Sequence, residues 1–317
     1  MAVTRLAPSP TGALHLGNAR TFLVNWALAR RNGWRVLLRI EDLDGPRIKA
    51  GAAAAAIETL AWLGLDWDGP PVYQSADAAP YTAPYTAALK RLAAAGQIYP
   101  CRCTRSQVVA ASLSAPHAGD PHEVRYTGAC RPPQPAPLPF TAEPGTAWRL
   151  RVPGGEQVFT DRFAGEASID VQQAVGDFLV ATKAGLPSYQ LAVVVDDCRQ
   201  GVTHVVRGDD LLASTPRQLL LMERLGFGPP PEYFHVPLVI GPDGRRLAKR
   251  HGDSRIQAYH GRGVPAERII GLLAEWCGVG PRREQTAEAF CQAFSLDAMP
   301  RGPVTFTAED DRWLLGG

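Results

Sequence analysis

Long apolar runs are missing from this sequence of 317 residues, and we expect no secretory leader. The N-terminus reaches Pro8 and Pro10 almost at once, which leaves no room for the apolar core of a signal peptide. The longest aliphatic runs, at 52–57 and 192–195, fall far short of the about 20 residues that a membrane-spanning helix needs. We therefore expect a soluble, cytoplasmic protein without a membrane partner.

A strong net charge is also absent, because 33 Lys and Arg residues are nearly balanced by 31 Asp and Glu residues. The net charge of +2 does not predict a nucleic-acid partner, so any contact with RNA has to come from a local patch. Six cysteines in a cytoplasmic chain argue against a disulfide framework. Neither a Gly-Lys-Ser/Thr phosphate loop nor a G-x-G-x-x-G fingerprint occurs, so a nucleotide site must use other motifs.

Strands and helices alternate along the chain. Apolar patterning predicts a strand at 2–7 followed by a helix at 15–31, and then a strand at 34–40 followed by a helix at 47–63. This order is typical of a parallel, doubly wound α/β sheet. The same patterning predicts further elements: helices at 76–96, 214–225 and 265–277, and strands at 148–152, 157–161, 190–196, 204–206 and 236–240.

A stretch rich in proline and glycine, at 116–144, interrupts this alternation. We interpret it as part of an inserted subdomain. The sequence therefore predicts four parts: the first half of the main domain at 1–99, the insert at 100–165, the second half at 166–252 and a short helical region at 253–317.

Two segments could hold a nucleotide. His15-Leu16-Gly17-Asn18 opens the first helix, and a helix N-terminus offers N–H groups and a partial positive charge to a phosphate. Much later, the loop 241–252 carries Arg246 and Lys249 between glycines, a pattern that can neutralise a triphosphate. Taken singly, the first segment is more typical of an ordinary helix cap, and the second of a solvated basic turn.

Together, these two segments resemble the two signature motifs of class I aminoacyl-tRNA synthetases. Further segments look like those of glutamyl-tRNA synthetases, and they follow that family's order over nearly the whole chain: 5–12, 39–44, 73–75, 186–192, 207–211 and 249–252. The resemblance implies a Rossmann-like α/β catalytic domain that uses ATP with Mg²⁺ to form an aminoacyl adenylate. It implies His15 and Lys249 as the catalytic charge stabilisers, and an ATP site made by His15, Gly17, Asn18, Arg246 and Lys249. The family usually has Lys-Leu-Ser-Lys where this chain has Arg246-Leu247-Ala248-Lys249, so a hydroxyl is lost at Ala248.

L-Glutamate is the amino acid that the resemblance implies. Its two carboxylates call for two cationic groups, and the planar fork of arginine suits a carboxylate. The positions that match the family's glutamate pocket are Arg5, Ala7, Ser9, Glu41, Tyr189 and Arg207, with Glu41 pairing with the substrate's ammonium group. Val193 stands where full synthetases usually have asparagine, which removes a polar contact.

Two features resemble one branch of the family, the glutamyl-Q tRNA(Asp) synthetases. The helical region after residue 252 is short, so we expect no anticodon-binding domain. The insert also contains Cys101-x-Cys103 and Tyr126-x-x-x-Cys130, similar to that branch's zinc site. Three thiolates suit tetrahedral zinc, and we expect one structural Zn²⁺ per chain. The residues leave open whether Tyr126, His117 or His122 is the fourth ligand, or whether no metal binds.

The branch resemblance implies transfer of glutamate to queuosine in the anticodon loop of tRNA(Asp), by a monomeric enzyme. Three alternatives stay open. A shortened glutamyl-tRNA synthetase would charge the 3′ end of tRNA(Glu), and a related enzyme would transfer glutamate to a small molecule or carrier protein. A non-catalytic, zinc-stabilised RNA-binding module would not need ATP motifs.

Overall fold

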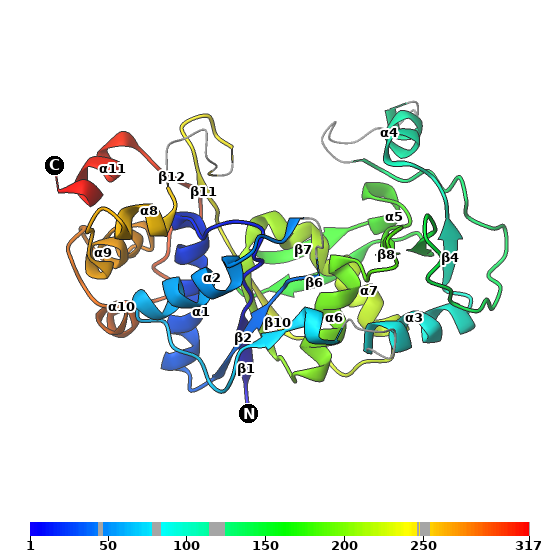
Figure 1. Cartoon of the computed structure of the whole chain (residues 1–317), viewed down its shortest axis with the longest axis horizontal. Helices are drawn as coiled ribbons and strands as arrows, with labels where there is room; N and C mark the ends of the chain where they lie inside the picture. Colours follow the sequence, from blue (N-terminus) through cyan, green and yellow to red (C-terminus); the bar gives the residue numbers. More distant parts are fainter. Residues whose placement is uncertain (44–46, 78–83, 114–123, 246, 248–253, 317) are drawn as a thin grey trace.

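The computed structural model describes the chain except residues 44–46, 78–83, 114–123, 246, 248–253 and 317, which are drawn in grey in Figure 1. A parallel sheet lies at the centre, the C-terminal helices lie at one end, and the part that carries the clustered cysteines lies at the other (Figure 1). Within the described residues, no helix combines the length and apolarity needed to cross a membrane.

The central sheet has two parts that meet at β1. In the first part β2 pairs in parallel with both β1 and β3. In the second part β10 pairs in parallel with β9 and β6, and β7 adds an antiparallel edge. The Thr203 N–H donates to Val3 O at 2.9 Å beside β9, which joins the parts. The strands are β1 (Val3–Leu6), β2 (Arg35–Ile40), β3 (Val72–Tyr73), β6 (Gln157–Asp161), β7 (Gly165–Ile169), β9 (His204–Gly208) and β10 (Glu232–Val236).

Helix α1 (Leu16–Arg31) shows why the N-terminal part folds as expected. His15 caps its first turn, and Gly33 ends the helix region with φ of 65°. Its buried face contains Leu16, Leu23 and Val24, which join the larger apolar core with β1 and β2. The other helices packed around the sheet are α2 (Ala52–Trp62), α6 (Tyr189–Arg199) and α7 (Thr215–Arg224), with 3₁₀ turns η2 (Gln74–Asp77) and η3 (Asp209–Ser214).

The expected strand at 190–196 is wrong, because this segment lies within helix α6. The run Val193-Val194-Val195 suggested a strand, since β-branched residues favour extended backbone. However, the Ser188 side chain caps α6 by accepting the Leu191 N–H. The three valines are buried in a second apolar core, and this burial outweighs a helix-propensity cost below about 0.7 kcal/mol per residue.

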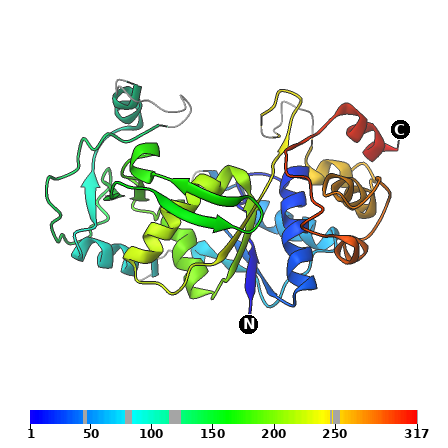
Figure 2. The ribbon, with the colours of Figure 1, turned by 180° about the vertical axis from the view of Figure 1, so that it is seen from behind.

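The region of the expected insert contains a separate three-stranded antiparallel sheet in the order β4-β5-β8. The sheet pairing divides the chain differently from the expected limits 100–165. Strand β6 lies inside those limits but pairs with β10 of the central sheet, while β8 lies beyond them and pairs with β5. Figure 2 shows the β6–β7 hairpin across the back of the molecule. The elements here are α3 (Pro84–Ala94), β4 (Ile98–Cys101), α4 (Arg105–Leu113), β5 (Ala147–Leu150), α5 (Val171–Ala174) and β8 (Leu179–Ala181).

The C-terminal region is helical, and it packs on the main core through α9 and α10. A buried arginine on α1, Arg20, donates to Pro237 O at 2.7 Å and to Trp276 O at 2.9 Å, which ties this region to the main domain. Its elements are β11 (Val239–Ile240), α8 (Ile256–His260), α9 (Ala266–Trp276), α10 (Ala287–Ala293), β12 (Val304–Thr305) and α11 (Ala308–Leu315).

Candidate active site

One cavity of about 560 Å³ lies where β1, the start of α1, β2, α6 and β9 meet. Every described residue that the sequence assigns to glutamate or ATP lines it: Arg5, Ala7, Ser9, His15, Gly17, Asn18, Glu41, Tyr189 and Arg207. These residues come from four segments that are far apart in the chain. Val193 is buried in the second core and does not line the cavity.

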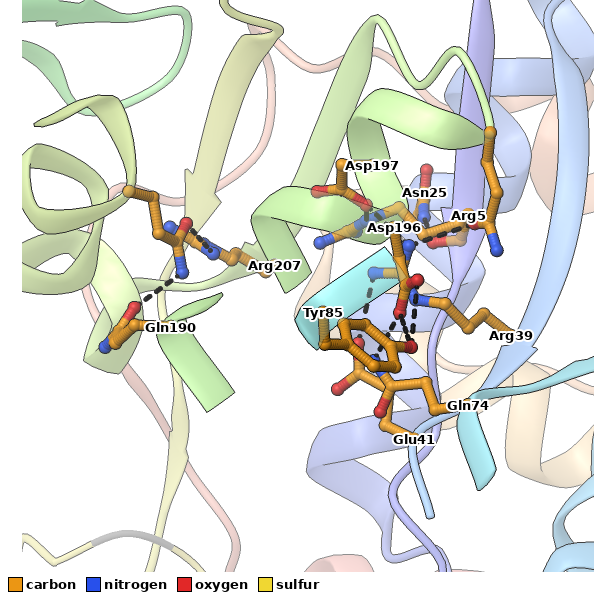
Figure 3. A network of polar contacts seen from close by, with 12 residues as sticks. Arg5, Asn25, Arg39, Glu41, Gln74, Tyr85, Gln190, Asp196, Asp197 and Arg207 are labelled. Atoms are coloured by element: carbon orange, nitrogen blue, oxygen red, sulfur yellow. Dashed lines mark hydrogen bonds and ion pairs between the residues drawn. The ribbon is translucent and has the colours of Figure 1, made fainter. Parts of the chain in front are cut away.

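A buried ion network fixes one wall of this cavity (Figure 3). The Asp197 carboxylate accepts from Arg39 Nη1 at 2.6 Å and from Arg5 Nε at 3.3 Å, and Arg39 Nη2 donates to Glu41 at 3.1 Å. Arg39 and Glu41 are two residues apart on an extended segment, so their side chains lie on the same side. Arg5 and Glu41 are therefore linked to each other through the Asp197–Arg39 pair.

Sequence reasoning missed Arg39 and Asp197 as supports of the cavity. The signal was available in the sequence. Arginine in the apolar stretch 36–40, and Asp196-Asp197 after three valines, place charges among residues that are otherwise buried. Charged side chains are almost never fully buried unless they are paired. What the sequence could not give was the identity of the partner, because Arg39 and Asp197 are 158 positions apart.

The two carboxyl groups of the network differ in acidity. Burial works to raise the pKa of Asp197, but Arg39 and Arg5 lower it below the ordinary value, so Asp197 is ionised. Burial raises the pKa of Glu41, and the neighbouring Arg39 and Arg5 do not fully reverse this. A positive charge brought beside Glu41 would therefore stabilise the ionised form of its carboxyl group.

Arg207, on β9, reaches the cavity from the opposite side. Its Nη1 donates to Gln218 Oε1 and its Nη2 to Thr215 Oγ1, both at 2.9 Å, and both acceptors are on α7. Gln218 in turn donates to Gln190 Oε1 at 2.9 Å. The cavity thus has guanidinium groups on two sides and a carboxylate at Glu41.

His15 forms a capping box at the start of α1. Its Nδ1 accepts the N–H groups of Gly17 at 3.1 Å and Asn18 at 3.4 Å, and Asn18 Oδ1 accepts the His15 N–H. A Cβ at position 17 would lie 3.0 Å from His15 Cε1, which explains the glycine. Because Nδ1 is an acceptor, a neutral imidazole carries its proton on Nε2. The two backbone N–H groups that the sequence analysis suggested as phosphate donors are therefore bound to the His15 side chain.

Two described residues in and after the cationic loop bond to β11 and to the start of α1. Leu247 N–H donates to Val239 O at 3.1 Å, and Ser254 O accepts the Leu16 N–H at 3.0 Å. Arg246 and Lys249, which the sequence assigns to ATP, lie outside the described residues. Of the described residues beside them, Leu247 bonds to Val239, which lines the cavity.

A second cavity, of about 530 Å³, shares Tyr189 with the first. It lies between the three-stranded sheet and the main domain. Its wall contains the cationic side chains of Arg105, Lys183 and Arg217, together with the aromatic ring of Phe178. Sequence patterning did not indicate this cavity, because its residues are spread over more than one hundred positions.

The three clustered cysteines come together at one edge of the second cavity. The Sγ atoms of Cys101, Cys103 and Cys130 all lie within 4.8 Å of one another, and two of them, Cys103 and Cys130, are 3.3 Å apart. Tyr126 Oη lies 3.6 Å from Cys101 Sγ and accepts the Cys130 N–H at 2.7 Å. His117 and His122 lie outside the described residues.

The thiols of this cluster differ in pKa. Burial acts to raise the pKa of Cys130, but hydrogen bonds from the Arg102 N–H and from Cys103 lower it to about 7. Burial and the hydrogen bond with Cys130 raise the pKa of Cys103 to about 11. Cys130 is therefore the readier of these two to supply a thiolate at neutral pH. Arg149 adds a positive charge here, since its Nε donates to Cys101 Sγ at 3.3 Å.

Comparison with known proteins identifies the family. The model of tRNA synthetases class I (E and Q), catalytic domain, matches residues 1–301. The chain belongs to this family. It is 48% identical to a glutamyl-Q tRNA(Asp) synthetase of Rhodopirellula baltica, over 88% of this chain and 86% of that relative. It is 40% identical to a glutamate–tRNA ligase of Oleidesulfovibrio alaskensis, over 99% of this chain but 65% of that relative.

A solved structure shows the same class I synthetase fold. The glutamate tRNA ligase of Elizabethkingia meningosepticum, in complex with its amino acid, has a TM-score of 0.80 and 26% identity, and the match covers 99% of this chain and 68% of that one. The expected α/β class I catalytic domain is thereby confirmed, and the chain is an enzyme of the ligase class.

Proposed function

We propose that this class I synthetase activates L-glutamate with ATP and transfers the glutamyl group to queuosine in the anticodon loop of tRNA(Asp). The activation of glutamate is supported by the arrangement of charges in the first cavity. Two guanidinium groups, on Arg5 and Arg207, face a space that also receives the Glu41 carboxylate. Glutamate has two carboxylates and one ammonium group, so its charges complement those of Arg5, Arg207 and Glu41.

In this proposal Glu41 receives the substrate's ammonium group. Burial raises the pKa of Glu41, and a positive charge brought beside it stabilises its ionised form. Arg5 is oriented through Asp197, and Arg207 through α7, so both guanidinium groups are in place before the substrate arrives. Such preorganisation lowers the cost of binding.

Adenylation requires positioning and charge stabilisation but no protein nucleophile. One α-carboxylate oxygen of glutamate forms a bond to the α-phosphorus of ATP, and the bond to pyrophosphate breaks. The Nε2–H of His15 can donate to a phosphate oxygen, and Lys249 and Arg246 neutralise the departing pyrophosphate. Mg²⁺ bound to ATP supplies further neutralisation. A hydroxyl of the RNA then attacks the adenylate carbonyl and releases AMP.

The second cavity supports an RNA acceptor. Tyr189 lines both cavities, so a group held in the second one lies next to the amino-acid site. Arg105, Lys183 and Arg217 offer positive charge to phosphates, and Phe178 offers a surface for a base. Queuosine of tRNA(Asp) is favoured over the 3′ end of tRNA(Glu) because this chain is 48% identical to the glutamyl-Q relative and 40% identical to the glutamate–tRNA ligase.

Amino-acid-dependent exchange of pyrophosphate into ATP tests the first half. Glutamate should support exchange, whereas glutamine, which lacks the γ-charge, and aspartate, which is shorter, should be at least about ten-fold poorer because charge-assisted bonds are lost. Equal exchange with glutamine or aspartate would contradict the assignment of Arg5 and Arg207. No exchange with any amino acid, in a folded protein, would favour the RNA-binding module.

A structural zinc in the cysteine cluster is part of the proposal. In a tetrahedral site with Zn–S bonds of 2.3 Å, the sulfur atoms lie about 3.8 Å apart. The Cys101, Cys103 and Cys130 sulfurs are within 4.8 Å of one another, and Tyr126 Oη is close enough to complete the set, so the residues fit the ion. A closed site of this kind would join β4 to the loop that contains Cys130.

We expect one zinc per chain in freshly purified, chelator-free protein, measured by elemental analysis. Cys103→Ser should lower the zinc content, because it removes one of three thiolates. Cys198→Ser is the matched control: this cysteine is exposed and outside the cluster, so zinc should be retained. Tyr126→Phe and His122→Ala, compared side by side, identify the fourth ligand. Absence of zinc from the unaltered protein would contradict the site.

A further inference from the structure

The Arg207 guanidinium also has a partner on β10, besides Gln218, Thr215 and the Leu211 carbonyl oxygen. Its Nε donates to His235 Nε2 at 2.9 Å, in addition to the bonds from Nη1 and Nη2 to α7. All three nitrogens of the fork are thus held by protein acceptors, which fixes both its position and its plane. His235 is 1% exposed and does not line the amino-acid cavity.

His235 must present a bare nitrogen to Arg207. The guanidinium has only donors and stays charged, so Nε2 has to accept. Thr215 Oγ1, at 3.3 Å from Nε2, can donate to the same lone pair. The imidazole is therefore neutral, with its proton on Nδ1. That nitrogen lies 2.6 Å from Asp161 Oδ2, which accepts the proton in a hydrogen bond.

Asp161, at the end of β6, is itself fixed as an acceptor. Its Oδ1 accepts the N–H groups of Phe163 at 2.9 Å and Ala164 at 2.7 Å, and the His235 N–H also points at the carboxylate. Burial opposes ionisation, but the bonds from His235 and these N–H groups lower the pKa of Asp161. Burial and the charge of Arg207 lower the pKa of His235, which keeps the ring neutral.

We propose that Asp161 and His235 are positioning residues for Arg207. Asp161 selects the His235 tautomer with a bare Nε2, and this tautomer aligns the guanidinium for a substrate carboxylate. The pair thereby sets the preference for a γ-carboxylate over a γ-amide. This inference rests on the proposed function, since it takes glutamate as the occupant of the cavity.

Asp161→Asn tests the tautomer with almost no change in shape. The amide oxygen has to keep the N–H groups of Phe163 and Ala164, because an NH₂ group there would meet two donors. The amide NH₂ then takes the place of Oδ2, so the His235 backbone N–H keeps only the bond to the amide oxygen, at the 3.2 Å position of Oδ1. The NH₂ faces His235 Nδ1 and donates to it, so the ring proton moves to Nε2. The proton on Nε2 then faces the Arg207 Nε–H, so the guanidinium loses this hydrogen-bond acceptor.

The expected kinetic result is a rise of about ten-fold or more in KM for glutamate, with kcat changed little, as for lost ground-state binding. The preference for glutamate over glutamine in pyrophosphate exchange should fall by a similar factor. His235→Gln, whose amide oxygen can take the place of Nε2, should keep more of this preference than His235→Leu. Asp310→Asn is the matched control: Asp310 is also buried, accepts an N–H and an arginine, and lies on α11. It should leave the preference unchanged.

The tautomer itself can be observed without a substrate. Long-range ¹H–¹⁵N NMR of the imidazoles, with the signal of His235 identified through His235→Gln among seven histidines, should show protonated Nδ1 in the unaltered protein and protonated Nε2 in Asp161→Asn. The same tautomer in both proteins, or a changed tautomer with an unchanged amino-acid preference, would overturn the inference. An unaltered protein that ignores glutamate but shows protonated Nδ1 would contradict the proposed function and leave the alignment of Arg207 supported.

Discussion

Replacing Lys249 by alanine should slow adenylate formation by about 10²–10³-fold, because one preorganised charge stabiliser of the departing pyrophosphate is lost. The effect should appear in kcat for pyrophosphate exchange, while KM for glutamate changes little, since Lys249 is not assigned to the amino-acid pocket. We base this on the family motif and on two bonds near Lys249: Leu247 bonds to Val239, which lines the cavity, and Ser254 bonds to Leu16 at the start of α1.

Lys90→Ala is the matched control for this prediction. Lys90 is an exposed lysine on α3, so its loss removes the same charge without touching either cavity. Exchange should be unchanged in this variant. A Lys249→Ala protein that forms the adenylate as fast as the control would show that the loop 241–252 is only a solvated turn.

Removing queuosine from tRNA(Asp) should reduce glutamate transfer to background, because the proposed acceptor hydroxyl belongs to that base. The unaltered and queuosine-free tRNA(Asp) differ at one nucleoside, so their comparison is direct. The rate of adenylate formation, measured by pyrophosphate exchange, should be the same with both tRNAs. Equal transfer to the queuosine-free tRNA would remove the proposed acceptor while leaving the activation of glutamate intact.

The 3′ end provides the second control. Queuosine-containing tRNA(Asp) from which the 3′-terminal nucleoside has been removed should still accept glutamate, whereas tRNA(Glu) should accept little. If the trimmed tRNA(Asp) is inactive and intact tRNA(Glu) is charged, the shortened glutamyl-tRNA synthetase is the correct alternative.

The sequence predicted the residues that line the first cavity better than it predicted what supports them. Arg5, Glu41 and Arg207 lie in recognisable segments, and each segment ends at the cavity edge of the sheet. Two of their partners could not be predicted. Asp197 comes next to Arg5, and His235 next to Arg207, only when the strands and helices pack. Patterns along a chain report local structure, whereas buried ion pairs depend on the tertiary arrangement.

The secondary structure, too, was predicted well where local signals determine it and poorly where tertiary packing does. The periodic segments that form β1, α1 and β2 were predicted nearly residue by residue, since a helix cap and apolar spacing act locally. The segment of α6 was mistaken for a strand, because a run of valines fits a buried strand or a fully buried helix equally well. The pairing of β6 with β10 joins segments about 70 residues apart, and no local pattern specifies it.

Identifying the labelled nucleoside shows directly whether the glutamyl group ends on queuosine. The protein is incubated with ATP, isotope-labelled glutamate and total tRNA, and the RNA is digested to nucleosides under mildly acidic conditions that preserve the ester. Mass spectrometry then identifies the nucleoside that carries the label. We expect labelled queuosine derived from the anticodon loop of tRNA(Asp). Label on the 3′-terminal adenosine of tRNA(Glu), with none on queuosine, would contradict it.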